Sequence, residues 1–96
     1  MMVLVTYDVN TESSAGRRRL RRVAQVCLNF GQRVQYSVFE CLVSEADFVR
    51  LQSRLQKEMD SGVDSIRLYV LDDTARRQIK HFGAGKPRDL DEPLVV

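Results

Sequence analysis

Three stretches of the chain have the hydrophobic pattern of β-strands. Residues 2–9 are apolar, rich in β-branched side chains and too short for a buried helix, and residues 33–43 and 64–71 carry the same kind of pattern. Because side chains alternate between the two faces of a strand, the first stretch places four apolar residues on one face, while its other face turns polar at Asp8. The four apolar residues are Val3, Val5, Tyr7 and Val9.

Between these strands, apolar residues recur with the period of an amphipathic helix. The first helix is expected over about residues 17–29, with Ser13 or Ser14 as its N-cap and Gly31 at its end. A second helix is expected to begin at Ser44. The pattern therefore predicts two helices among the strands.

The order of these elements predicts an α+β fold of the ferredoxin-like βαββαβ type. We expect a turn at residues 72–74 to lead into the fourth strand, which ends at Phe82. Right-handed connections would then put both helices on one face of a four-stranded antiparallel sheet. Residues 1–82 form this single domain, and residues 83–96 form a linker and a C-terminal tail. Residues 94–96 are apolar and predict a tail strand that pairs with the partner protomer of a homodimer.

Composition and charge narrow the classes of protein and site. The 96-residue chain has 15 Lys and Arg against 13 Asp and Glu, a net charge of +2, so the total charge indicates no partner by itself. No stretch approaches the roughly 20 apolar residues of a membrane span, and the start lacks the basic region of a signal peptide, so we expect a cytoplasmic protein without a membrane partner. The chain offers only three soft ligands, Cys27, Cys41 and His81, which are too few for a structural zinc site. The two cysteines therefore indicate buried thiols in a reducing compartment.

Asp8 is the first candidate for chemistry, because it stands where an apolar strand ends. A carboxylate there can bind a hard cation such as Mg²⁺, which takes one or two carboxylates together with water and phosphate oxygens. A two-fold axis near the strand end would add a second Asp8 from a partner copy, and the pair would position a water against a phosphodiester. The alternative is that Asp8 only opens a turn before Asn10.

Five arginines fall within the six residues that start at Arg17, at the beginning of the first predicted helix. A helix N-terminus is already positive, so each cation there costs about 0.3–1 kcal/mol, whereas a phosphate partner would reverse the sign. Helical spacing turns Arg18 and Arg22 toward solvent and leaves Arg17 nearer Asp8. The alternative is a solvated basic face with salt bridges to Glu12 or to acids of the tail.

Aromatic residues and the single histidine are two further candidates for a functional site. Tyr7, Tyr36 and Phe39 can stack on bases, although aromatic residues in strands are more often core or interface residues. His81 is the only histidine and lies far along the chain, so the sequence indicates no general base beside Asp8.

Three segments resemble the small CRISPR-associated Cas2 family. They are Tyr7-Asp8-Val9, the run from Arg17 to Ala24, and the string Gly-Gln-Arg-Val-Gln-Tyr-Ser-Val-Phe-Glu-Cys at residues 31–41. That string, placed after an arginine-rich helix, is the most specific of the three. The predicted strand at residues 64–71 and the short apolar tail are compatible with the resemblance, which covers most of the chain.

The resemblance implies a ferredoxin-like homodimer that works with the Cas1 integrase when new CRISPR spacers are acquired. Members of the family are described as Mg²⁺-dependent endonucleases on RNA or DNA, and also as non-catalytic bridges that hold incoming DNA. The family's catalytic and metal-binding aspartate falls on Asp8. The resemblance assigns nucleic-acid binding to Arg17, Arg18, Arg19, Arg22 and Arg33, and interface or stacking contacts to Tyr7 and Phe39.

Three functions remain open at this point. The first is an endoribonuclease or DNase with paired Asp8 carboxylates at the dimer axis and Mg²⁺ as cofactor. The second is a non-catalytic DNA-binding scaffold that bridges Cas1 subunits, in which Asp8 is structural. The third is a metabolic or regulatory ferredoxin-like domain that binds no nucleic acid.

Overall fold

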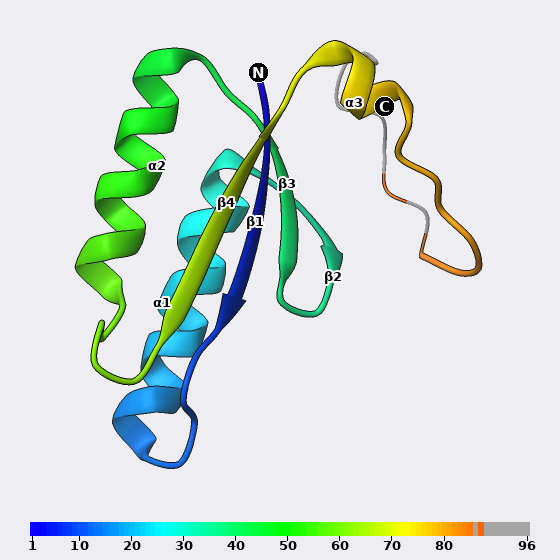
Figure 1. The fold of residues 1–96 in the computed structure, drawn as a ribbon. Coiled ribbons are helices and arrows are strands. Elements are labelled where there is room, and N and C mark those ends of the chain that lie inside the picture. Colours follow the sequence, from blue (N-terminus) through cyan, green and yellow to red (C-terminus); the bar gives the residue numbers. More distant parts are fainter. Residues whose placement is uncertain (86, 88–96) are drawn as a thin grey trace, which may run out of the picture.

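The structure is a computed structural model, and it describes residues 1–85 and 87 of the chain. Its strands are β1 (Met2–Asp8), β2 (Gly31–Gln35), β3 (Val38–Leu42) and β4 (Ser65–Leu71). Its helices are α1 (Ser14–Phe30), α2 (Glu45–Glu58) and the short α3 (Asp73–Arg77). The strands form one antiparallel sheet in the order β2-β3-β1-β4, and α1 and α2 pack together on one face of it (Figure 1). This arrangement confirms the predicted α+β ferredoxin-like fold. No helix in the described part of the chain is long and apolar enough to cross a membrane.

β1 is a central strand, and one of its faces forms the middle of the hydrophobic core. Val3, Val5, Tyr7 and Val9 are all buried, as the alternating pattern predicted. Pairing with β3 sets Val5 opposite Phe39, which is fully buried. A fully buried aliphatic or aromatic side chain contributes roughly 1.5–3 kcal/mol, so this face holds the helices on the sheet. The helices cover it with Val23 and Cys27 from α1 and with Leu51 and Leu55 from α2.

Cys27 and Cys41 lie in this core as free thiols. Burial raises the pKa of Cys27 to about 12 and the pKa of Cys41 to about 11. Both thiols therefore stay protonated at neutral pH, which makes them poor nucleophiles and poor metal ligands. This confirms the interpretation of the two cysteines as buried thiols.

The stretch 33–43, which was expected to form one strand, is instead most of a hairpin. A turn at Tyr36 and Ser37 joins β2 to β3, and the register shifts between Arg33 and Gln35. The turn contains no Gly, Pro, Asn or Asp, so its composition gave none of the usual signals of a chain reversal. This hairpin supplies two of the four strands.

Gly31 lies where α1 passes directly into β2. A glycine at the end of a helix often adopts a left-handed conformation, and this was expected of Gly31. Its φ is instead −169°, which is extended backbone. A Cβ at this position would lie 2.1 Å from the carbonyl oxygen of Glu40 and 2.6 Å from the Cα of Cys41. Glycine is therefore required here by the close approach of β2 to β3.

The fourth strand predicted after residues 72–74 is wrong. The chain forms α3 there, because the carboxylate of Asp72 caps the helix by accepting a hydrogen bond from the backbone N–H of Ala75 over 2.7 Å. The sheet nevertheless has four strands because of the hairpin. The tail strand predicted at residues 94–96 lies outside the described residues.

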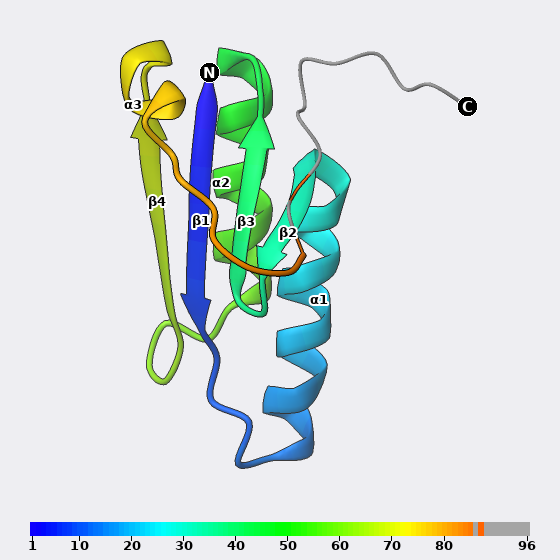
Figure 2. The same ribbon diagram turned by 90° about the vertical axis from the view of Figure 1, so that its right-hand side faces the viewer.

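The face of the sheet opposite the helices is open. Figure 2 shows the segment that follows α3 passing in front of this face. Ile79 and Phe82 on that segment are 45% and 87% exposed, so they do not bury themselves against the sheet. On the other face, Val70 pairs with the buried Val3 of β1 but is itself 55% exposed, because β4 is an edge strand.

A buried carboxylate fixes the loops at the end of the sheet where β1 finishes. Asp64 immediately precedes β4, and its side chain is 0% exposed. It accepts hydrogen bonds from the backbone N–H of Asn10 over 2.9 Å and from that of Asp60 over 2.8 Å. It also forms an ion pair with Arg19 of α1, at 2.8 Å between Nε and Oδ2. The loop after β1, the start of α1 and the loop before β4 are thus held together by one side chain.

The electrostatics of this carboxylate depend first on its arginine partner. The Arg19 guanidinium and the two backbone N–H groups lower the pKa of Asp64 from 3.8 to about 2, against the opposing effect of burial. A group whose pKa is lower in the folded state stabilises the fold above its unfolded pKa. The stabilisation by Asp64 is therefore complete above about pH 4 and is lost as the pH falls toward 2.

We predict that Asp64→Asn lowers the free energy of unfolding at pH 7 by about 2–3 kcal/mol, because it leaves the charge of Arg19 without its partner. Chemical denaturation at pH 7 and pH 2 measures this, and the difference between parent and variant should shrink at the lower pH. Asp47→Asn is the control, since its carboxylate pairs with Arg50 in an exposed position and its loss should cost less than about 1 kcal/mol. Equal stability of the two variants at pH 7 would contradict the role of Asp64.

Candidate functional site

Asp8 is the last residue of β1, and its side chain is exposed. It pairs with Ser65 of β4, and strand alternation directs it to the face opposite the helices. Within residues 1–85 and 87, no hydrogen bond or ion pair engages its carboxylate. Asp8 opens no turn before Asn10, because the backbone N–H of Asn10 donates its hydrogen bond to Asp64 over 2.9 Å. A separate turn follows, in which the Oδ1 atom of Asn10 accepts a hydrogen bond from the backbone N–H of Glu12 over 3.0 Å. The carboxylate of Asp8 is therefore free for a ligand.

A free, exposed carboxylate at a strand end fits one position of a Mg²⁺ site, since Mg²⁺ prefers hard oxygen ligands. Among the described residues, no three His, Cys, Asp or Glu side chains group closely enough to hold a metal ion. One protomer thus provides one carboxylate ligand at this position. The remaining ligands of a cation bound there would have to come from water, from the substrate or from a second protein chain.

The arginine run at the start of α1 divides into two kinds of side chain. Arg19, assigned to nucleic acid by the resemblance, is held in the ion pair with Asp64 and is only 18% exposed. Arg17, Arg18 and Arg22 are exposed, as is Arg21. Among the residues that the structure describes, Arg19 is the only arginine of the run in an ion pair. Of the alternative salt bridges, the one to Glu12 does not form, and the acids of the tail lie outside the described residues. The exposed arginines form a basic surface at the start of α1.

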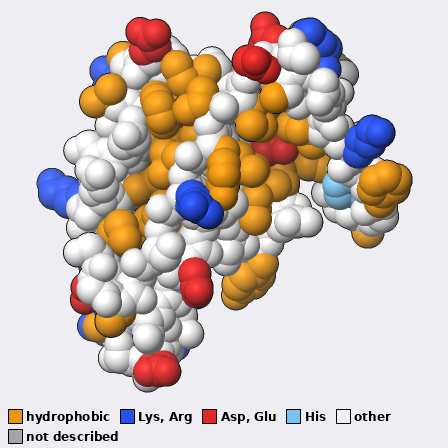
Figure 3. All heavy atoms as spheres, viewed as in Figure 1, with side chains coloured by type: hydrophobic (Ala, Val, Ile, Leu, Met, Phe, Trp, Pro, Cys, Tyr) orange, Lys and Arg blue, Asp and Glu red, His pale blue; other side chains and the backbone are white. Residues whose placement is uncertain are grey.

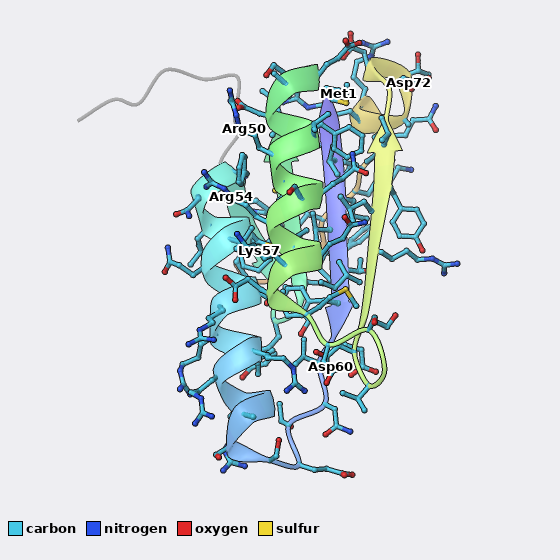
Figure 4. All side chains as sticks on the ribbon, turned by 90° about the vertical axis from the view of Figure 1, so that its left-hand side faces the viewer. Met1, Arg50, Arg54, Lys57, Asp60 and Asp72 are labelled. Atoms are coloured by element: carbon cyan, nitrogen blue, oxygen red, sulfur yellow. The ribbon has the colours of Figure 1, made fainter. Side chains whose placement is uncertain are left out.

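α2 adds a second row of cations beside α1. Arg50, Arg54 and Lys57 occur three and four residues apart along this helix and are exposed (Figure 4). The guanidinium of Arg54 lies over the ring of Phe30, 5.5 Å from its centroid, which places it against the end of α1. Arg54 and Lys57 thus add exposed positive charge on α2 to that of the arginine run, whereas Arg50 is paired with Asp47.

Tyr7 and Phe39 are core residues, not stacking residues for bases. Phe39 is fully buried and Tyr7 is 7% exposed, and their rings stack on each other with centroids 6.1 Å apart. Burial raises the pKa of Tyr7, and a hydrogen bond with Arg33 partly offsets this effect. The burial of these two rings agrees with the interpretation of strand aromatics as core residues, and it leaves little of either ring exposed for stacking on a base in the protomer.

Arg33 remains exposed at the edge of this aromatic cluster. Its guanidinium carbon lies 5.0 Å from the ring centroid of Phe39 and 5.9 Å from that of Tyr36, the exposed residue of the hairpin turn. Both distances are within the range of a cation–π contact. Arg33 is thus positioned by two aromatic rings at the same end of the sheet as Asp8.

No histidine acts as a base beside Asp8. His81, the only histidine of the sequence, lies on the segment after α3, where its Nε2 atom is 2.9 Å from the carbonyl oxygen of Ala84. That segment follows the opposite end of β4 from the one that pairs with Asp8. Asp8 and His81 therefore do not form a carboxylate–histidine pair within the protomer.

Sequence reasoning missed Asp64, although this residue organises the end of the sheet. An acid before a strand is common in loops, and nothing in its neighbours shows that it becomes buried. The five-arginine run also hid the different role of Arg19, because all five residues have the same local signal. Only the packing of α1 against the loop before β4 distinguishes them.

Comparisons with known proteins all find similarity to Cas2 proteins over most of the chain. The family model described as CRISPR associated protein Cas2 matches residues 1–79. The chain is 56% identical over 96 residues, all of both chains, to the CRISPR-associated endoribonuclease Cas2 of Chlorobaculum tepidum. It is 45% identical over 95 residues, 99% of each chain, to the CRISPR-associated endonuclease Cas2 of Halalkalibacterium halodurans.

A solved structure shows the same likeness. The crystal structure of Streptococcus pyogenes Cas2 superposes with a TM-score of 0.77 at 55% sequence identity, covering 86% of this chain and 100% of that one. The similarity to Cas2 proteins thus covers most of the chain. That chain has the fold, the free carboxylate of Asp8 and the exposed arginines of α1 described above. The chain belongs to the CRISPR-associated Cas2 family.

Proposed function

We propose that this chain is a metal-dependent endonuclease of CRISPR spacer acquisition, acting on RNA or DNA as a homodimer in the cytoplasm. The observation that carries the proposal is the Asp8 carboxylate, which is exposed, stands at a strand end and has no structural partner among the described residues. The names of the relatives support it, since they are called an endoribonuclease and an endonuclease.

In this proposal, Asp8 binds the cation, the exposed arginines bind the substrate, and Asp64 positions the loop after Asp8. Asp8 would hold a divalent cation together with the same residue of a second copy, with water and with phosphate oxygens of the substrate. When bound, the cation supplies charge for the phosphodiester and a more acidic water. Arg18 and Arg22 bind backbone phosphates, and the ion pair of Asp64 with Arg19 keeps the loop after Asp8 in place.

Two features support a homodimer. The open face of the sheet carries Tyr69, which is 42% exposed, beside partly buried apolar residues of the neighbouring strands. The outer edge of β4 is unpaired within the described residues, and Figure 3 shows hydrophobic side chains gathered where α2 and β4 lie. Val49 and Val70 are among the exposed residues of these two elements. A second copy would cover the face, and its tail would supply a strand for the edge.

A non-catalytic scaffold is the second candidate function. Besides the exposed arginines at the start of α1, Arg54 and Lys57 of α2 (Figure 4) offer further cations for backbone phosphates, as a protein that holds DNA would use. In this function the dimer binds DNA and bridges Cas1 integrase subunits, and Asp8 cleaves nothing. Both functions use the same arginines, so only the chemistry at Asp8 distinguishes them.

We predict that purified protein cleaves labelled RNA or duplex DNA with Mg²⁺ and not with EDTA, and that Asp8→Asn reduces cleavage to the EDTA level. The variant removes one negative charge from the cation site without changing the size of the side chain. Asp73→Asn, an exposed acid on α3, is the matched control and should cleave as the parent does. Equal cleavage by the Asp8 variant, or none by the parent, would favour the scaffold.

We predict that Arg18→Ala combined with Arg22→Ala weakens binding to duplex DNA and reduces the slope of log affinity against log salt by about 2, since each lost phosphate contact releases about 0.9 fewer counterions. Fluorescence anisotropy at several salt concentrations measures both quantities. Arg77→Ala with Lys80→Ala removes the same charge elsewhere and should leave the slope unchanged. An unchanged slope in the α1 variant would contradict phosphate binding by these arginines.

We predict that removing residues 93–96 weakens the homodimer, because the tail then has no apolar strand to add to the edge of β4. Sedimentation velocity over a range of concentrations gives the dimer dissociation constant. A chain in which four Ser and Gly residues replace 93–96 keeps the length and should behave like the truncated form. If both variants dimerise as the parent does, the tail does not pair with the partner.

A further inference from the structure

Tyr36 is the one aromatic residue near Asp8 whose ring is open to solvent among those described. It occupies the turn between β2 and β3 and is 80% exposed, whereas Tyr7 and Phe39 are buried. Exposing a large ring at a turn brings no packing energy, because its apolar surface stays in water. Apart from the cation–π contact with Arg33, the protomer therefore gains little from the ring of Tyr36.

The ring of Tyr36 is linked to the buried aromatic pair through Arg33. Tyr7 stacks on Phe39 with an interplanar angle of 24°. The guanidinium of Arg33 lies over Phe39 at 5.0 Å and over Tyr36 at 5.9 Å. Arg33 thus joins the buried aromatic pair to the exposed ring and restricts the orientations of that ring. The cost of ordering Tyr36 on ligand binding is correspondingly small.

The turn that carries Tyr36 lies at the end of the sheet where β1 finishes. The backbone N–H of Tyr7 donates a hydrogen bond to the carbonyl oxygen of Ser37 over 3.2 Å, so the turn is tied to the residue that precedes Asp8. Figure 2 shows this turn beside α1, at the same end of the sheet as the tip of β1. The turn that carries Tyr36 and the strand end that carries Asp8 therefore lie at the same end of the sheet.

We propose that Tyr36, backed by Arg33, is a stacking platform for one unpaired base of the nucleic acid that reaches Asp8. Every base offers a flat π-face, so an aromatic platform binds single strands with little preference for sequence. A base within a duplex has both faces covered by its neighbours and cannot use the platform. The inference rests on the proposed action on nucleic acid and narrows the substrate to one that is single-stranded beside Asp8.

The test uses full-length protein carrying Asp8→Asn, so that the probe stays intact. The probe is a short single-stranded RNA with 2-aminopurine at one position, moved along the strand in a set of oligonucleotides. At the position that meets the platform, binding should quench the fluorescence of 2-aminopurine through stacking. Tyr36→Ser should remove the quenching and weaken binding of the single strand about ten-fold or more, within the range found for one base–aromatic contact.

Three controls separate stacking from other effects. Tyr36→Phe keeps the ring and should bind within about two-fold of the parent, since stacking needs the π-face and not the hydroxyl. Phe82→Ser removes an equally exposed ring from the segment after α3 and should change nothing. Binding of a blunt duplex should be unaffected by Tyr36→Ser.

The outcomes distinguish this inference from the proposed function. Equal binding and quenching by Tyr36→Ser would overturn the platform while leaving cleavage at Asp8 untouched. A change in sedimentation of Tyr36→Ser without RNA would also overturn it, because the ring would then be an interface contact between copies. Quenching that depends on Tyr36 in a protein whose cleavage does not depend on Asp8 would support the platform and reject the catalytic proposal.

Discussion

The end of the sheet that carries Asp8 is organised by one buried carboxylate. Asp64 has no exposed surface, and it is tolerable there only because Arg19 and two backbone N–H groups satisfy its charge. Two of its partners, Asn10 and Arg19, lie 54 and 45 residues away in the sequence, and the third, Asp60, lies four residues before it. The path of the chain after Asp8 is therefore set by a side chain more than fifty residues away, and the position of the catalytic candidate depends on this contact.

This arrangement separates structural from available charge within a short stretch of sequence. Arg19 neutralises Asp64, while its neighbours on α1 stay exposed, with no acid anywhere in that helix to pair with them. Asp8 has no hydrogen-bond or ion-pair partner among the described residues, because the backbone N–H of Asn10 that it could have accepted from donates to Asp64 instead. A negative group with nothing to bind and a set of exposed positive groups thus share one end of the molecule. Phosphate and a divalent cation are the ligands that suit both.

Much of the fold followed from local pattern, and the errors have physical causes. The core face of β1 was readable because alternation in a central strand leaves four apolar residues on one side. The hairpin was missed because its turn, Tyr36 and Ser37, lacks the residues that usually mark a reversal. The segment that forms α3 was predicted as a strand, because the residues after Asp72 have only a weak preference for either structure. In the protein, the hydrogen bond by which Asp72 caps the segment starts a helix there. Of the site, Asp8 and the exposed arginines were accessible from sequence, whereas the burial of Asp64 depends on contacts between remote segments.

The two edges of the sheet differ in a way that limits how copies of the chain can join. β2 is five residues long, and its ladder is interrupted by the shift between Arg33 and Gln35, whereas β4 pairs without interruption over all seven of its residues. Irregular, short edges resist the addition of strands, and long regular ones invite it. Growth into an open ribbon needs two receptive edges on every copy, and this chain offers one. If a strand is added at β4, as proposed for the homodimer, the addition would stop after a single step, and the described sheet would give a closed assembly of few copies rather than a fibre.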